Sequence, residues 1–199
     1  MEKELEMLLK KTEAFVKELL EKELPKNMYF HNFEHTLLVV EGVKLIGNQN
    51  NIAKSDMVLL TLAAFLHDVG YTKQYIGHEL ASTQIAKAFL LENGLEPTQI
   101  ETVNSLIRAT KYPQLPKNNL EQIICDADFY HFSLQNYTAF ASRLKSEWEE
   151  ILHLVYSDRE WDAINLDMLA GHEYFTDYGK KILQKKKNLN IEKLVQRFT

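Results

Sequence analysis

The sequence predicts an all-α protein, folded as a single-domain helical bundle over residues 1–199. Apolar residues recur every three or four positions along most of the chain, which is the spacing of one face of an amphipathic helix. No comparable stretch alternates apolar and polar residues with the period of two that indicates a strand. No internal repeat and no linker rich in Gly, Ser or Pro divides the chain, so one domain is expected.

The first predicted helix carries an apolar stripe from Leu5 to Leu20, and Pro25 ends it because proline cannot continue a helix. The remaining helices are expected at about residues 32–47, 55–68, 78–93, 97–111, 119–133, 134–156 and 157–187, with a short last helix after residue 190.

Several helix boundaries have a local cause. Ser157 and Glu160 have the spacing of a capping box, in which each side chain bonds an exposed amide at a helix start. Gly94 and Gly70 are expected to close helices in the left-handed conformation. Two prolines should keep residues 112–117 out of regular helix.

Charge and composition narrow the function. The net charge of -5 argues against a general nucleic-acid binder, and the lysine-rich segment 180–187 is expected to be a solvated helix face. The longest apolar run, residues 57–66, is far shorter than the roughly 20 residues that span a bilayer, and the amino terminus has no secretory apolar region. The single cysteine, Cys125, cannot form an internal disulfide. We therefore expect a cytoplasmic protein without a membrane segment.

The stretch AAFLHDVGY, residues 63–71, places two polar side chains at the end of a very apolar helix. His67 continues the stripe of Leu60 and Ala64 and should point inward, and Asp68 follows it directly. Burying a carboxylate without compensation is expensive, whereas a nearby cation relieves that cost. A bound metal ion would explain both residues.

Two more segments offer ligands of the same kind. In YFHNFEHTLLVV, residues 29–40, His31 and His35 are four apart and would lie on one helix face. In IICDADFYHF, Asp126 and Asp128 project about 160° apart on a helix, so only one should reach a given ion. The helical wheel favours Asp128, and Asp126 remains the alternative.

Together these motifs resemble the HD-domain metal-dependent phosphohydrolase superfamily. Its ordered pattern of a histidine, a His-Asp pair and a distant aspartate is met by His35, His67 with Asp68, and Asp128, within about residues 29–132. The resemblance implies an all-helical fold in which these four side chains hold a divalent metal ion, with one ion expected and a second to be considered.

The resemblance also implies further roles. HNFEH is similar to the HNxxH segment of cyclic-nucleotide phosphodiesterases, which makes His31 the candidate general acid, although Phe30 stands where those enzymes usually have tyrosine. The DADF segment again favours Asp128 as ligand and leaves Asp126 a place behind the ligands. His78, with Glu79 beside it in GHELAS, is the candidate for a second ion.

A mixed imidazole and carboxylate site could take Mn, Fe, Mg, Co, Ni or Zn. Such an ion, held by Asp68 and the neighbouring ligands, would activate a water molecule for attack on the substrate phosphorus. His31 would protonate the leaving group. Arg108 and Lys111 are candidates for holding the substrate phosphate, although cations near a helix end also favour its dipole.

The sequence therefore predicts a hydrolase acting on a nucleotide or another small phosphoester, with neither nucleic acid nor membrane as partner. Two alternatives stay open. One is oxygen-dependent oxidation at two irons, as in some members of the same superfamily. The other is a nucleotide-binding module without turnover.

Overall fold

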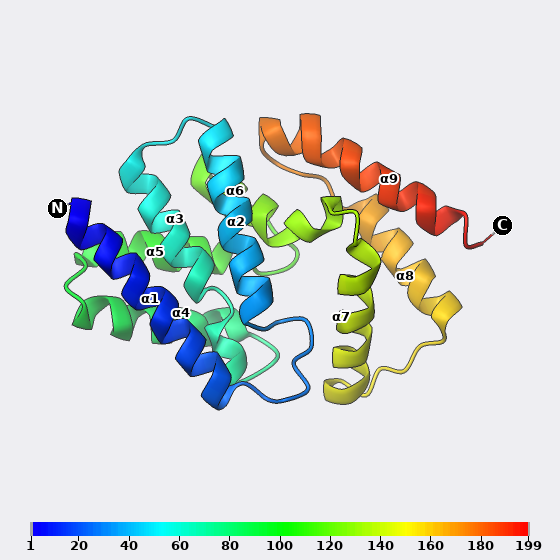
Figure 1. Ribbon diagram of the computed structural model, residues 1–199, viewed down its shortest axis with the longest axis horizontal. Helices are drawn as coiled ribbons and strands as arrows, with labels where there is room; N and C mark the ends of the chain where they lie inside the picture. Colours follow the sequence, from blue (N-terminus) through cyan, green and yellow to red (C-terminus); the bar gives the residue numbers. More distant parts are fainter. Residues whose placement is uncertain (1, 199) are drawn as a thin grey trace.

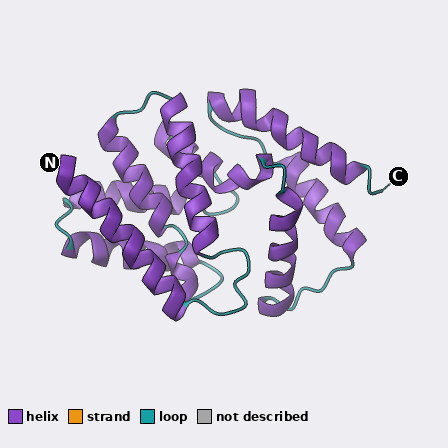
Figure 2. Ribbon diagram, viewed as in Figure 1, coloured by secondary structure: helices purple, strands orange, loops and turns teal. Residues whose placement is uncertain are grey.

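The computed structural model describes residues 2–198, and within that range it contains helices and loops but no strand (Figure 2). The predicted all-α fold is confirmed. The first part of the chain forms α1 (Glu2–Glu23), α2 (Phe33–Gln49), α3 (Lys54–Leu66), η1 (Val69–Thr72), α4 (His78–Glu92), α5 (Pro97–Ala109) and α6 (Asn119–Asp128). The second part forms η2 (Phe129–Ser133), α7 (Tyr137–Ile151), α8 (Asp158–Gly171), η3 (Gly179–Leu183) and α9 (Gln184–Val195).

Helices α1 to α6 gather on one side of the molecule, and α7 to α9 form the other side (Figure 1). Helix α2 packs against both α3 and α6, and α4 packs against α5 and η1. The turn η2 follows α6 and contacts α7 and α9, so it joins the two sides. None of the described helices is long and apolar enough to cross a membrane.

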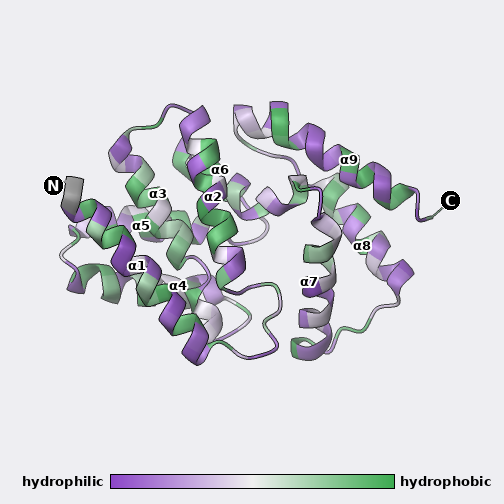
Figure 3. Ribbon diagram, in the orientation of Figure 1, coloured by the Kyte–Doolittle hydropathy of each residue, from purple (hydrophilic) through white to green (hydrophobic). Residues whose placement is uncertain are grey.

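The core lies where α2, α3 and α6 meet. Their inward residues repeat at helical spacing and are at most 4% exposed: Val39, Val40, Val43, Ile46, Leu60, Ala63, Ala64, Ile123, Ile124 and Ala127. A side chain added at Gly42 would lie 3.1 Å from Ala127, so the small residue lets α2 and α6 approach closely. In Figure 3, α1 and α9 alternate between hydrophilic and hydrophobic residues, as expected for helices with one exposed face.

The local signals at several boundaries are confirmed. The Ser157 amide donates to Glu160 Oε2 at 2.8 Å and the Glu160 amide donates to Ser157 Oγ at 3.3 Å, which forms the capping box of α8. Gly94 closes α4 with a φ of 79°. Residues 112–117 lie outside regular helix.

The expectation for Gly70 is wrong. It lies in η1 and does not have a positive φ. Its amide donates to Ser82 Oγ at 2.8 Å, and an added Cβ would collide with the His78 carbonyl and lie 2.7 Å from the Ser82 amide nitrogen. Glycine is needed here because α4 passes directly over the backbone that follows the His-Asp pair.

The single helix expected over residues 157–187 is also wrong. Helix α8 ends at Gly171, and helical structure resumes at residue 177, passes through the π-helical turn η3, and continues in α9 beyond residue 190. The separate last helix is therefore the end of α9. The break occurs because Asp126 of α6 accepts the amides of Phe175 at 2.7 Å and Thr176 at 2.9 Å, which holds that segment outside helix.

Lys187 departs from the solvated face expected for residues 180–187. Its side chain is fully buried, and its ammonium donates to the carbonyl of His172, the C-cap residue that follows α8. Burial lowers the pKa of Lys187 to about 8. A cation at a helix C-terminus interacts favourably with the unsatisfied carbonyls there.

Replacing Gly70 by alanine should lower the free energy of unfolding by about 3 kcal/mol, because the added methyl group meets backbone atoms that cannot move independently. Denaturant unfolding measures the effect. Gly171→Ala is the matched control, since an added Cβ at that helix end meets nothing within 4 Å and should be neutral or slightly stabilising. A Gly70→Ala variant as stable as the wild type would contradict this account.

Candidate metal centre

The site begins with the cap of α2. The side-chain oxygen of Asn32 accepts the amides of Glu34 at 2.9 Å and His35 at 3.3 Å, so it satisfies donors that the first turn leaves free. The Asn32 amide group donates to the carbonyl of Tyr29 at 2.8 Å. Asn32 therefore fixes the start of α2, and His35 in that first turn points inward with 3% exposure.

Four side chains from three segments converge near this cap. His35 Nε2 lies 3.4 Å from Asp68 Oδ2 and 3.4 Å from Asp128 Oδ1. His67 Nε2 lies 3.1 Å from Asp68 Oδ2 and 3.7 Å from Asp128 Oδ1. Adjacent ligand atoms that each stand about 2.1 Å from one ion are separated by about 3 Å, so this spacing suits a shared cation. The structure brings together the four side chains that the sequence analysis selected.

Several atoms of this cluster that could bind a metal ion make no hydrogen bond within the described residues. His35 Nε2, His67 Nε2 and Asp68 Oδ2 are buried and make no hydrogen bond. His67 Nδ1 lies 2.9 Å from the carbonyl oxygen of Ala64, to which it can only donate, so the neutral ring carries its lone pair on Nε2. Unpaired buried polar atoms are rare, and a divalent cation bound by His35, His67 and Asp128 would account for these.

The electrostatics of the cluster favour positive charge. Burial disfavours a charged imidazole, but the negative charge of Asp68, whose Oδ2 lies 3.1 Å from His67 Nε2, outweighs it and raises the pKa of His67 to about 9. Burial also acts against a charged Asp68, yet the attraction of His67 and His78 holds the pKa of Asp68 well below its usual range. In the absence of metal, a proton on His67 therefore partly balances the carboxylates. Metal binding has to displace that proton.

His78, from the first turn of α4, reaches the other oxygen of Asp68. Its Nε2 lies 3.4 Å from Asp68 Oδ1 and 4.0 Å from Glu79 Oε1. Its Nδ1 lies 3.2 Å from the Tyr75 carbonyl, and its ring stacks on Tyr71 with centroids 3.7 Å apart. Asp68 thus stands between His67 and His78, as a carboxylate shared by two ions would. That His78 or Glu79 binds a second ion stays a prediction.

His31 precedes the cap of α2 and is held by a residue that the sequence analysis missed. Glu147 of α7 is fully buried. Its Oε2 accepts the amides of Phe30 at 2.8 Å and His31 at 3.0 Å, and its Oε1 accepts the Tyr75 hydroxyl at 2.8 Å and bonds His31 Nδ1. Burial raises the pKa of Glu147, but the charge and hydrogen bonds of His31 and its amide outweigh burial and lower it overall.

A signal for Glu147 was present in the sequence. It lies at helical spacing from Tyr137, Phe140 and Ala141, which form the buried stripe of α7. A carboxylate on an apolar stripe is the same pattern that singled out Asp68. The charged run SEWEE around Glu147 conceals it, because charged runs are usually solvated.

Asp126 does not lie behind the ligands as expected. Besides the two amides of residues 175 and 176, it accepts the Thr176 hydroxyl at 2.7 Å, so both of its oxygens bind the segment after α8. The structure therefore separates the two aspartates of DADF. Asp128 lies at the cluster, and Asp126 anchors the C-terminal part of the chain to α6.

Arg108 and Lys111 are not brought to the cluster either. Arg108 is paired with Glu101 at 2.5 Å, and both cations line a shallow groove of about 350 Å³ with Tyr112 and Leu115. None of the cluster residues lines that groove. A role of Arg108 and Lys111 in holding a phosphate at the metal centre has no support in this arrangement.

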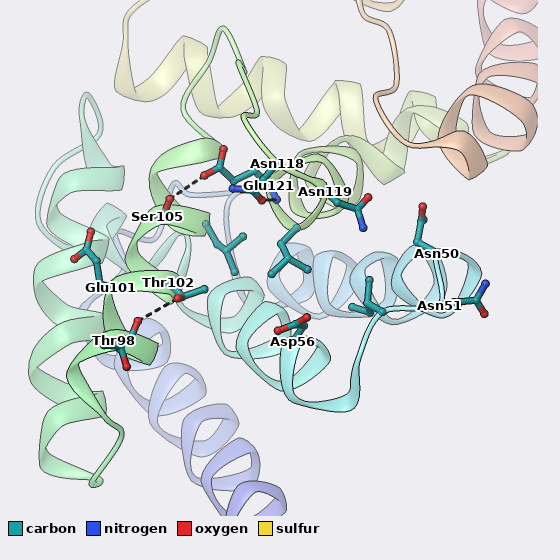
Figure 4. Close-up of a pocket in the computed structure, with 13 residues that line it drawn as sticks. Asn50, Asn51, Asp56, Thr98, Glu101, Thr102, Ser105, Asn118, Asn119 and Glu121 are labelled. Atoms are coloured by element: carbon teal, nitrogen blue, oxygen red, sulfur yellow. Dashed lines mark hydrogen bonds between the residues drawn. The ribbon is translucent and has the colours of Figure 1, made fainter.

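A groove of about 680 Å³ lies at the opposite ends of α2, α3 and α6 (Figure 4). Its labelled side chains are amides, hydroxyls and carboxylates, among them Asn50, Asp56, Ser105 and Asn119, and no Lys, Arg or His lines it. Such a lining does not attract phosphate. This groove is therefore separate from the metal cluster, which lies at the other end of the same three helices.

Comparison with protein families gives one match. The family model described as HD domain matches residues 32–133, just over half of the chain. This range contains His35, His67, Asp68 and Asp128 and ends before α7. Neither the curated proteins nor the solved structures compared with the chain gave a match.

Alanine at each aspartate of DADF should give opposite results. Asp126→Ala should lower the free energy of unfolding by about 3 kcal/mol, because it leaves buried amides unpaired, and should keep metal uptake. Asp128→Ala should lose most metal uptake with a smaller loss of stability. Elemental analysis and thermal unfolding measure the two effects, and the reverse pattern would make Asp126 the ligand.

Proposed function

The chain belongs to the HD domain family, which is the superfamily of HD metal-dependent phosphohydrolases, and on this basis we propose that it hydrolyses a nucleotide or another small phosphoester. The observation that carries the proposal is the convergence of His35, His67, Asp68 and Asp128, whose buried ligand atoms include several without a hydrogen-bond partner among the described residues. A structural core gains nothing from such atoms, whereas a divalent cation fits them.

In this proposal the four side chains hold one divalent ion, of which Mn, Fe, Mg, Co, Ni and Zn all suit a mixed nitrogen and oxygen set. When bound, the ion supplies Lewis acidity and lowers the pKa of water, so that a nucleophile is available near neutral pH. Asp68 and Asp128 neutralise part of the ion's charge. His35 and His67 must be uncharged to bind it. Donation of His67 Nδ1 to the Ala64 carbonyl fixes the tautomer, so that the neutral ring presents the lone pair of Nε2 to the ion.

In this proposal His31 acts as the general acid. Its Nδ1 bonds Glu147 Oε1, so Nε2 is the ring nitrogen left to donate to a leaving group. The His31 ring lies 5.7 Å from the His35 ring, centroid to centroid, and its side chain is 17% exposed, so a leaving group beside the ion can reach it. Glu147 and the Tyr75 hydroxyl keep the ring from rotating away.

The low exposure of the cluster supports a small substrate. The side chains of His31, His78 and Asp128 are only 17%, 15% and 19% exposed. A phosphoryl group can enter between them, whereas a folded nucleic acid cannot approach so closely. The choice of a nucleotide rests on the similarity of HNFEH to the phosphodiesterase segment.

One observation favours the second candidate, oxidation at two metal ions. His78 approaches the second oxygen of Asp68 at 3.4 Å, so the site offers a shared carboxylate. Iron-loaded protein that takes up oxygen in the presence of an organic substrate, and releases no phosphate from phosphoesters, would favour that function over hydrolysis.

The direct test is an activity screen. Protein purified without added metal and then supplied with Mn²⁺, Mg²⁺ or Co²⁺ should release phosphate or a monoester from at least one of a panel of cyclic nucleotides, mononucleotides and simple phosphoesters. Asp68→Ala should abolish both metal uptake and turnover. Asp167→Ala, which removes an exposed carboxylate of α8, is the control and should retain both. Full activity in Asp68→Ala would rule out the proposal.

Substrates with different leaving groups can distinguish proton donation by His31 from a role in metal binding. His31→Asn and Glu147→Gln should slow hydrolysis of esters with alkyl or nucleoside leaving groups by about 10²–10⁴-fold, because those oxygens need a proton. A 4-nitrophenyl ester should lose far less, since its leaving group departs as an anion. Metal content should stay near that of the wild type. Equal losses on both esters would exclude His31 as the acid, and loss of metal would make it a ligand.

A further inference from the structure

The two oxygens of Asp128 have different surroundings. Oδ1 faces the imidazoles of His35 and His67 at 3.4 and 3.7 Å. Oδ2 accepts a hydrogen bond from the side-chain amide of Gln114 at 3.0 Å. Gln114 belongs to the loop between α5 and α6, outside all regular helix, and is 8% exposed.

The orientation of the Gln114 amide follows from its neighbours. Its Nε2 faces Asp128 Oδ2 and lies 3.4 Å from the carbonyl oxygen of Thr110, both of which are acceptors. Turning the amide over would place its own oxygen against a carboxylate, which is repulsive. The chemistry of the two acceptors therefore fixes Nε2 as the end that binds Asp128.

Stability alone does not explain this glutamine. Its Oε1 is buried and has no hydrogen-bond partner among the described residues, and an unpaired buried acceptor costs about 1–3 kcal/mol. The residues on either side of it in the loop behave differently, since Tyr112 is 72% and Leu115 is 77% exposed. The loop thus turns the Gln114 side chain inward to reach Asp128 Oδ2, although this leaves Gln114 Oε1 unpaired.

We propose that Gln114 is a positioning residue of the metal centre. By binding Oδ2 it stops the Asp128 carboxylate from rotating and presents Oδ1 to the ion as a single-oxygen ligand. Hydrogen bonds of this kind to a ligating carboxylate typically change metal affinity by 10–100-fold when they are removed. The inference rests on the proposed metal site, but it does not depend on which reaction the site performs.

The test uses Co²⁺, whose visible absorption reports both binding and coordination geometry. Gln114→Met keeps the size of the side chain and removes the donor, so it should weaken Co²⁺ binding by about 10–100-fold. The absorption spectrum of the bound ion should also change, because Oδ2 becomes free to join Oδ1. Leu115→Ala, in the same loop, is the control and should match the wild type in both respects.

Gln114→Asn is the second variant, because it keeps a buried amide that is too short to reach Oδ2 and should weaken binding in the same direction. Thermal unfolding of the metal-free proteins separates a loosened fold from a misoriented ligand. A folded Gln114→Met or Gln114→Asn variant with wild-type Co²⁺ affinity and spectrum would overturn the inference. Wild-type protein that binds Co²⁺ but hydrolyses no phosphoester of the panel would contradict the hydrolase proposal and leave the role of Gln114 intact. A wild type that binds no Co²⁺ would overturn both.

Discussion

The arrangement depends on a buried carboxylate, that of Asp68. It is 5% exposed and lies 3.1 Å from His67 and 3.4 Å from His78. A buried charge is tolerated only when partners meet it with good geometry. Those partners come from the end of α3 and the start of α4, so the chain between them has to be held closely. Gly70 permits this, because it lets α4 lie against the backbone that follows Asp68.

The C-terminal helices support the metal centre, although its candidate ligands all come from the first part of the chain. Helix α7 supplies Glu147, which holds His31 in place, although α7 lies beyond the range matched by the HD domain family. Asp126 ties α6 to the segment after α8, and Asn190 of α9 donates to the carbonyls of Phe132 at 2.9 Å and Leu134 at 2.8 Å. These contacts hold both sides of Asp128, the last residue of α6.

The sequence was informative wherever a polar residue interrupts an apolar helical stripe. His67 with Asp68 breaks such a stripe at the end of a very apolar helix, and the structure brings His35 and Asp128 to the same place. The same reasoning failed for the helix expected over residues 157–187. Its interruption at residues 172–176 is caused by Asp126 and Lys187, which are distant in sequence, and no periodicity within the segment reports it.

The sequence by itself therefore determined the all-α fold, because helical periodicity and capping are local properties of the chain. Polar residues on apolar stripes, with the resemblance to the HD superfamily, pointed to His35, His67, Asp68 and one of the two aspartates of DADF. Only the tertiary structure decided which aspartate of DADF faces the cluster, since that depends on how α6 is rotated against α2 and the C-terminal segment. The same is true of Glu147 and Gln114. Glu147 lies on an apolar stripe hidden by a charged run, and Gln114 lies in an irregular loop. The role of each depends on a partner, His31 or Asp128, that chain folding brings within hydrogen-bond distance.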